Sequence, residues 1–147
     1  MDFEPIERLT EDQVGQLHRL FQGEWWTRGR TLEDVRRMLK HTDITLGLCE
    51  QATGRLVAFA RVLTDRVFKA FIFDVIVDPA YRGRGLGIRI MESVLGHPDL
   101  ARVRHLELYC HQEMFPFYRR WGFTEDVGGS LLMRRTAPSG RSSPKDE

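Results

Sequence analysis

The sequence contains little cysteine, no long apolar run and almost no net charge. Its two cysteines, Cys49 and Cys110, lie within apolar runs, which favours free buried thiols in a reducing compartment over a disulfide scaffold. No apolar run approaches the roughly 20 residues that a membrane helix needs. The formal net charge of +1 creates no overall field that attracts nucleic acid or an anionic membrane. We therefore expect neither as a partner.

The first residues also lack a targeting signal. Residues 1–5 have neither the basic segment nor the apolar core of a signal peptide, and we expect a cytoplasmic protein. A chain of 147 residues corresponds to one domain and can bury a core without disulfides or a structural metal. We predict a single domain over residues 1–136 and no metal site. Residues 137–147 are rich in Ser, Pro and charge, which predicts a flexible tail.

Apolar spacing and capping signals predict the elements. A first strand is expected at residues 5–9. Two short helices follow, because Thr10 with Gln13 and Thr31 with Asp34 have the spacing of a capping box. Further helices are expected after a glycine-rich turn, ending near Gly96, and from Pro116 onward, with Gly122 at the C-terminal end of the last helix. The remaining strand candidates are residues 44–49, 56–63, 71–77, 106–110 and 131–133.

The order of these elements indicates an α/β (α+β) protein. Residues 44–49 and 56–63 are typical of an antiparallel hairpin. Residues 71–77 are apolar on both faces, as expected of a central strand. The strands before and after the glycine-turn helix should be parallel neighbours. The sequence thus predicts a mixed sheet with helices on its faces.

Three glycines at every second position open the third helix. Gly83, Gly85 and Gly87 follow a strand directly. Glycine permits positive φ and close approach of a ligand, and a helix N-terminus offers unpaired N–H groups to phosphate. Arg82 and Arg84 can add charged contacts. The turn therefore predicts a cradle for pyrophosphate.

Two common phosphate loops do not fit this turn. The Walker loop requires Gly-Lys-Ser/Thr, but Gly87 is followed by Ile88 and Arg89. The dinucleotide fingerprint requires glycines at positions one, three and six, and an isoleucine occupies the sixth position in either register. The pattern that fits is Arg-x-x-Gly-x-Gly.

With these residues in place, the sequence resembles the GNAT superfamily of N-acetyltransferases. Residues 75–87 are similar to the acetyl-CoA-binding motif of that family, and residues 117–123 are similar to its Phe-Tyr-x-x-x-Gly-Phe segment. The order of elements agrees over about residues 5–135. The resemblance implies a mostly antiparallel sheet of six to seven strands, flanked by about four helices and splayed between strands four and five.

The resemblance also implies an activity: transfer of an acetyl group from acetyl-CoA to a primary amine, most simply that of a small molecule. Two alternatives stay open, namely a CoA-binding module without chemistry and acetylation of a protein amino group. A longer acyl group is a further option, and dimers are common in the family, which allows a homodimer. The implied cofactor-binding residues are Val75, Ile76 and Val77 for the pantetheine arm, and Arg82, Gly83, Arg84, Gly85, Leu86 and Gly87 for the pyrophosphate.

Candidate catalytic residues follow from the same comparison. Tyr118 matches the tyrosine that commonly protonates the leaving thiolate, although a tyrosine packed in the core would have the same pattern. Asp74 is the candidate base or amine anchor, and strand alternation places it on the same face as Ile72 and Ile76; a structural aspartate bonded to an arginine is the alternative. Glu24 is the rival base, and His111 and Glu113 are weaker candidates.

The loop of residues 23–30 has the most distinctive composition. Trp25 and Trp26 could wall an acceptor pocket by offering their ring faces to a cation or an apolar group. Arg28 could hold an acceptor carboxylate. The alternative is that both tryptophans pack the N-terminal helices onto the sheet.

Overall fold

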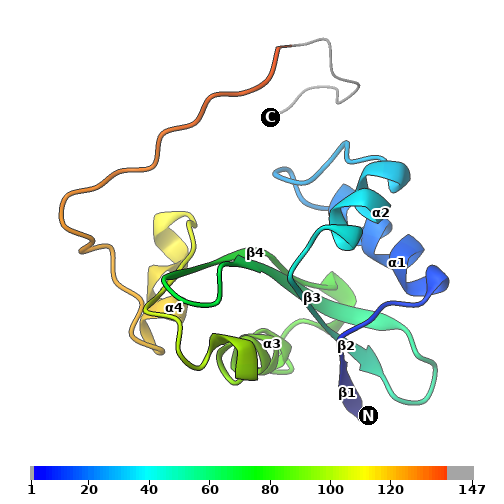
Figure 1. The fold of residues 1–147 in the computed structure, drawn as a ribbon. Coiled ribbons are helices and arrows are strands. Elements are labelled where there is room, and N and C mark those ends of the chain that lie inside the picture. The colour runs from blue at the N-terminus through cyan, green and yellow to red at the C-terminus, as the bar shows by residue number, and fades with distance from the viewer. Residues whose placement is uncertain (1, 139–147) are drawn as a thin grey trace.

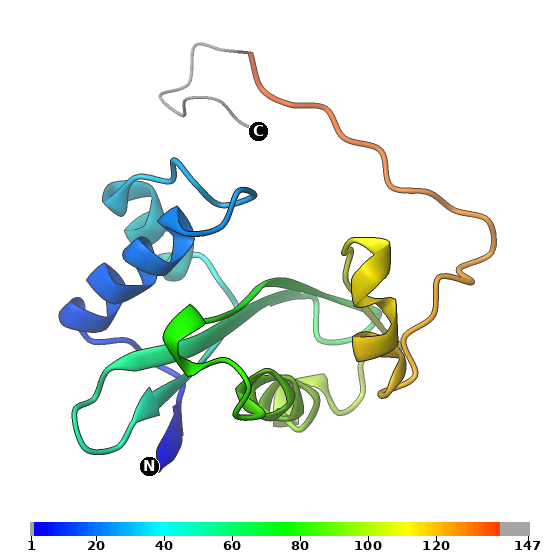
Figure 2. The same ribbon diagram turned by 180° about the vertical axis from the view of Figure 1, so that it is seen from behind.

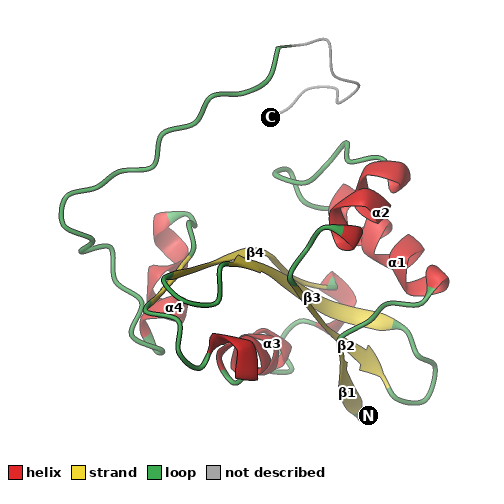
Figure 3. Ribbon diagram, in the orientation of Figure 1, coloured by secondary structure: helices red, strands yellow, loops and turns green. Residues whose placement is uncertain are grey.

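The computed structural model describes residues 2–138, so most of the predicted tail, from residue 139 on, lies outside the described residues. The chain forms five strands and four α-helices within this range, with short 3₁₀ turns between them (Figures 1 and 3). In order they are β1 (Phe3–Ile6), α1 (Glu11–Gln22), α2 (Leu32–Lys40), β2 (Ile44–Glu50), β3 (Leu56–Thr64), β4 (Lys69–Val77), α3 (Leu86–Leu95), β5 (His105–Glu107) and α4 (Phe115–Arg119).

The five strands form one sheet in the order β1-β2-β3-β4-β5. The first three pairs are antiparallel, including the predicted hairpin of β2 and β3. Strands β4 and β5 are parallel, which confirms the prediction from the crossover through α3.

The expected count of six to seven strands is wrong. Residues 131–133 form no strand, and Leu131, Leu132 and Met133 are 88%, 60% and 92% exposed. A short apolar run becomes a strand only when it pairs with a partner strand, and within residues 2–138 this run pairs with none. The first strand is also shifted, to Phe3–Ile6.

Helices cover both faces of the sheet, α1 and α2 on one side and α3 on the other (Figures 1 and 2). Each face has its own apolar cluster. The cluster under α1 and α2 is centred on Leu17, Phe21 and Phe59, and that under α3 on Leu86, Ile90 and Met91.

The predicted capping signals begin both N-terminal helices. Thr10 and Gln13 form a complete capping box, with reciprocal hydrogen bonds of 2.9 and 3.2 Å. The Thr31 hydroxyl accepts from the Asp34 N–H at 3.0 Å. The Thr31 cap fixes where the 23–30 loop ends, and that loop borders the candidate site.

Candidate active site

The edge of β4 is left open where β5 ends. The two strands pair only from Lys69 to Phe71 of β4, opposite His105 to Glu107. Strand β4 continues for six more residues to Val77, so within residues 2–138 its backbone there has no strand partner on that side. This is the splay between strands four and five that the resemblance implied, and it exposes backbone hydrogen-bonding groups of the segment that includes Val75, Ile76 and Val77.

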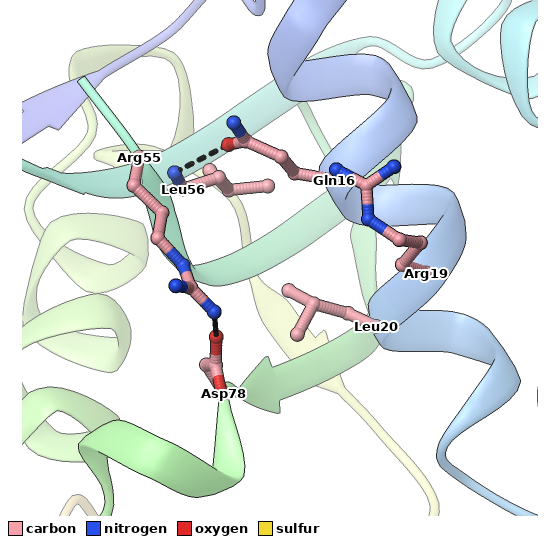
Figure 4. A pocket seen from close by; sticks show the side chains of 6 residues that line it. All are labelled: Gln16, Arg19, Leu20, Arg55, Leu56 and Asp78. Atoms are coloured by element: carbon pink, nitrogen blue, oxygen red, sulfur yellow. Dashed lines mark hydrogen bonds and ion pairs between the residues drawn. The ribbon is translucent and has the colours of Figure 1, made fainter. Parts of the chain in front are cut away.

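A turn at residues 78–81 connects β4 to the glycine-rich turn that precedes α3. Asp78, only 6% exposed, accepts from the Ala80 N–H at 2.9 Å and from Arg55 at 2.9 Å. The Arg55 guanidinium also lies 5.5 Å from the centroid of the Tyr81 ring. Arg55 and Asp78 line a pocket of about 400 Å³ together with Gln16, Arg19, Leu20 and Leu56 (Figure 4). The Arg55–Asp78 ion pair thus fixes the turn that leads into the glycines.

The glycine-rich turn leaves open space around Gly83 and Gly85, next to the N-terminus of α3. Gly83 and Gly85 have φ of 80° and 75°, and a Cβ at either position would meet no atom within 4 Å. Gly85 is the N-cap of α3 and makes no side-chain capping bond, which leaves the first N–H groups of the helix without a capping side chain. These groups and the positive end of the helix dipole fit a pyrophosphate.

Two arginines border this turn. The Arg82 guanidinium donates to the Glu24 carboxylate at 2.8 Å and to the Val77 carbonyl at 3.4 Å. Arg84 is exposed and lies 5.3 Å from the Tyr81 ring centroid. Glu24 therefore lies against the predicted phosphate cradle and joins it to the loop after α1.

A bulge in β4 determines where Asp74 points. The pairing of β3 with β4 shifts by one residue there, and Asp74 has φ of 57°, which aspartate tolerates better than most residues. The extra residue reverses the alternation, so Ile72 packs with α3 and Ile76 with α1. The expectation that Asp74 shares one face with both isoleucines is therefore wrong.

Two arginines hold the Asp74 carboxylate on the side of α1 and α2. Arg30 donates to both of its oxygens, at 2.8 and 3.1 Å, and Arg61 donates to one at 2.6 Å. Burial alone would raise the pKa of Asp74, but the hydrogen bonds and charges of Arg30 and Arg61 outweigh burial and lower it. Arg61 was not among the predicted site residues, although a charged residue inside each of two neighbouring apolar strands is a signal for a buried ion pair.

Tyr118 is 8% exposed and lies in α4. Burial, with a smaller contribution from Cys110, raises the pKa of Tyr118 to about 12. The phenol makes no hydrogen bond within residues 2–138, and its ring packs edge-on against Phe117 and Phe123. Cys110 is a half-buried free thiol, whereas Cys49 is buried. Tyr118 and Cys110 line the same cavity beside β5.

The two tryptophans of the loop do not pack into the core. Trp25 is 59% and Trp26 41% exposed. The Trp25 ring lies 5.2 Å from that of His111, at an interplanar angle of 30°, so the loop after α1 contacts the segment after β5. Arg28 donates to the Gln22 carbonyl at 3.3 Å and braces its own loop. Arg30, not Arg28, is the loop arginine that reaches β4.

Aromatic rings continue along the β4–β5 surface. Phe71 lies 4.8 Å from Phe73 and 5.6 Å from Tyr109, measured between ring centroids. The Arg61 guanidinium lies 4.7 Å from the Phe73 centroid. This surface can contact an apolar or aromatic molecule. Among the described residues, no group of three or more His, Cys, Asp or Glu side chains could hold a metal ion, and no helix is long and apolar enough to cross a membrane.

With this geometry in place, comparison with known proteins identifies the family. Residues 10–123 match the model of the acetyltransferase (GNAT) family. The chain belongs to that family, as the two motifs and the splayed sheet indicated.

Individual relatives agree with this assignment. The chain is 35% identical over 125 residues to "GCN5-related N-acetyltransferase 1, chloroplastic" of Arabidopsis thaliana, covering 84% of this chain and 63% of that protein. It is 36% identical over 115 residues to "Serotonin N-acetyltransferase 2, chloroplastic" of Oryza sativa subsp. japonica, covering 77% and 57%. The chain thus spans less than two thirds of either relative's length.

A solved structure extends the similarity to the fold. A protein of Xanthomonas campestris pv. campestris assigned to the GNAT family of acetyltransferases superposes with a TM-score of 0.81 at 33% identity. The alignment covers 94% of this chain and 95% of that one. The five-stranded arrangement found here is therefore a GNAT fold.

Proposed function

We propose that this protein transfers an acetyl group from acetyl-CoA to a primary amine of a small molecule. The observation that carries the proposal is the open edge of β4 beside the uncapped N-terminus of α3. The open edge, near Val75 to Val77, would pair with the amides of a pantetheine arm. The turn from Arg82 to Gly87 would hold the pyrophosphate, and acetyl-CoA would supply an activated thioester.

Acetyl transfer forms a C–N bond and breaks the C–S bond of the thioester. An alkylamine has a pKa near ~10.4 and must lose a proton before it attacks. The oxyanion that forms needs a hydrogen-bond donor, which we assign to a backbone N–H on the open edge of β4 near Val75. The leaving sulfur must receive a proton, or it will return to the acyl carbon.

Tyr118 is the proposed donor to the sulfur. With its pKa raised to about 12, the phenol keeps its proton at neutral pH. Full transfer from so weak an acid to a thiolate is uphill, so the phenolate must regain a proton at once. The proton released by the amine supplies it, and the step balances without another reagent.

His111 is the proposed proton acceptor for the amine. The sequence favoured two carboxylates. Arg30 and Arg61 lower the pKa of Asp74, which makes it a poor proton acceptor, and the Glu24 carboxylate accepts a hydrogen bond from Arg82. His111 lies exposed against Trp25, with Glu113 3.9 Å from its Nδ1. We assign Asp74 to holding the 23–30 loop against the sheet through Arg30.

The acceptor is proposed to be an amine with an apolar or aromatic body. The partly exposed rings of Phe71, Phe73, Tyr109 and Trp25 support this, since they offer stacking surfaces beside the open edge. The rice relative named for serotonin supports the same choice. The same relative favours a small acceptor over a protein amino group.

Calorimetric titration with acetyl-CoA tests the donor site, with free CoA, NAD and ATP as controls. Gly85→Glu should abolish binding, because it places a charged side chain in the cradle. Gly54→Glu is the matched control: Gly54 has φ of 75° and open space around it, as Gly85 does, but lies in the β2–β3 turn. The control should bind acetyl-CoA like the parent protein.

A screen of amines then tests the chemistry, with the released CoA thiol as readout. Turnover with arylalkylamines above that with aliphatic amines supports the proposed acceptor class. Binding without turnover on any amine would leave a CoA-binding module, and absence of CoA binding by folded protein would remove the enzyme proposal.

A further inference from the structure

The cluster of Arg30, Arg61 and Asp74 has an excess positive charge. Two guanidinium groups share one carboxylate, and within residues 2–138 neither arginine forms a second ion pair. The side chains of Asp74 and Arg61 are 4% and 14% exposed, so water screens this charge poorly. A charge in such surroundings is costly unless it is paired. One further anionic group would therefore neutralise the cluster.

Arg61 is the member of the cluster with unused hydrogen-bond donors. Its Nε donates to Asp74 at 2.6 Å, and its two terminal nitrogens donate no hydrogen bond within residues 2–138. Arg30, in contrast, uses both of its terminal nitrogens on Asp74, at 2.8 and 3.1 Å. The terminal nitrogens of an arginine form a planar fork that fits a carboxylate with two hydrogen bonds. An added carboxylate would thus bind to Arg61 rather than to Arg30.

The acids of the neighbouring segments have other partners. Glu24, in the loop after α1, accepts from Arg82 at 2.8 Å. Glu113, in the segment after β5, lies 3.9 Å from Nδ1 of His111. Residues 2–138 therefore give Arg61 no carboxylate besides that of Asp74, and a ligand would have to supply the second one.

Arg61 also lies at the aromatic surface that is proposed to receive the acceptor. Its guanidinium is 4.7 Å from the Phe73 ring centroid, and the rings of Phe71 and Tyr109 continue from Phe73. In the sheet Arg61 pairs with Phe73, two residues before Val75, where the oxyanion donor is proposed. Two residues of a strand span roughly 7 Å. An amine and a carboxylate on one small molecule can therefore reach the acyl group and Arg61 together.

We propose that the acceptor carries a carboxylate beside its amine, as an aromatic amino acid does, and that Arg61 binds this carboxylate. The proposal rests on the proposed function for the position of the amine. Arg61 would donate to both carboxylate oxygens, and the ring of the acceptor would stack beside Phe73. The products are the N-acetylated amino acid and the CoA thiol, with the amine proton transferred in net terms to the sulfur. Arg61 thereby selects amino acids over amines that lack a carboxylate.

Matched acceptors test this selection in the full-length protein. L-phenylalanine, L-phenylalaninamide and phenethylamine share a ring and an amine, but only the first carries a carboxylate. Values of kcat/KM are divided by the neutral fraction of each amine, because their amine pKa values differ. We expect L-phenylalanine to exceed both others by about 10–100-fold, as for hydrogen bonds to a charged group, with most of the difference in KM.

Substitution of Arg61 tests the residue assignment. In Arg61→Met the ratio of kcat/KM for L-phenylalanine to that for phenethylamine should fall to about one. The ratio cancels any general loss of activity or of folded protein. Arg61→Lys keeps the charge without the fork and should retain part of the preference. Arg28→Met is the matched control, because exposed Arg28 lies in the 23–30 loop and donates to the Gln22 carbonyl; it should keep the ratio of the parent protein.

Calorimetric titration with L-phenylalanine, with and without CoA, separates this site from the proposed activity. Binding that Arg61→Met abolishes, without turnover of any amine, would support the carboxylate site and count against the transferase proposal. Equal corrected rates for the three acceptors, or no binding of L-phenylalanine to the folded parent protein, would overturn the carboxylate site and leave the transferase proposal standing. A preference for L-phenylalanine that Arg61→Met retains, or that only Arg28→Met removes, would overturn the assignment to Arg61.

Discussion

Burial raises the pKa of Tyr118 to about 12, with Cys110 adding to the effect. Tyr118→Phe keeps the ring contacts with Phe117 and Phe123 and removes only the hydroxyl, which makes no hydrogen bond within residues 2–138. We therefore expect unchanged stability and acetyl-CoA affinity. The turnover number should fall by about 10²-fold, as for loss of a general acid.

The raised pKa of Tyr118 also predicts how the proposed activity behaves at alkaline pH. Because the folded-state pKa of Tyr118 lies above the ordinary value for tyrosine, the phenol keeps its proton up to about pH 12. Steady-state rates from pH 7 to 10.5 should then show no decline from loss of this proton. A Tyr118→Phe variant as active as the parent protein would remove Tyr118 from the mechanism.

His111 is the second residue whose role kinetics can decide. His111→Gln should lower the turnover number by about 10²-fold while leaving acetyl-CoA binding intact. Added imidazole should restore part of the rate if the lost group is a proton acceptor. Glu113→Gln is the matched control, since Glu113 lies 3.9 Å from the imidazole and is not assigned a proton. Lack of rescue would favour a purely structural stacking role against Trp25.

For single residues, the sequence indicated the type of side chain at the site better than it indicated that side chain's bonding partners. An aspartate in the apolar run 71–77 had to be paired, solvated or catalytic, and the structure pairs it with Arg30 and Arg61. The bulge at Asp74 could not be predicted, because the extra residue becomes visible only when β4 is aligned with β3. Alternation alone therefore gave the wrong faces for Ile72 and Ile76.

Among the elements, the turn between β4 and α3 is braced by the Arg55–Asp78 ion pair. Arg55→Met would leave the Asp78 carboxylate, 6% exposed, without its guanidinium partner. The turn should loosen, and acetyl-CoA affinity should fall about tenfold, or about 1.4 kcal/mol. Calorimetry provides the measurement. Arg19→Met is the control, because Arg19 lines the same pocket (Figure 4) but makes no ion pair within residues 2–138. Equal losses in both variants would contradict a specific role for the pair.

Elements defined by local signals were predicted well. The Thr10 and Thr31 caps begin α1 and α2 where expected, since a capping bond spans only three residues. The last helix is shorter than predicted: α4 ends at Arg119, and Trp121 lies beyond it, although Gly122 has the positive φ of 87° expected near a helix end. The expected strand at 131–133 failed for a different reason, because strand formation depends on a partner edge that no local signal identifies.

For the molecule as a whole, Asp74 joins three parts of the fold. Its carboxylate connects β4 to β3 through Arg61 and to the loop between α1 and α2 through Arg30. Asp74→Asn preserves tolerance for φ of 57° but leaves Arg61, 14% exposed, without its counterion. Breaking a buried pair in this way should lower the free energy of unfolding at pH 7 by about 3 kcal/mol.

The pH dependence of that difference follows from the lowered pKa of Asp74. A carboxylate with a depressed folded-state pKa stabilises the fold fully above its unfolded pKa of about 3.9 and loses this contribution as the pH falls through the lower folded value. Urea unfolding measures this difference. The free energy of unfolding of the parent protein should exceed that of Asp74→Asn by a constant amount from pH 7 to about 5, and the difference should shrink below about pH 4. Glu125→Gln, which breaks the exposed pair with Arg119, should change stability far less. Equal stability of parent and Asp74→Asn at pH 7 would mean that desolvation of the carboxylate cancels its contacts with the arginines, and that the 23–30 loop is held against the sheet by its apolar contacts alone.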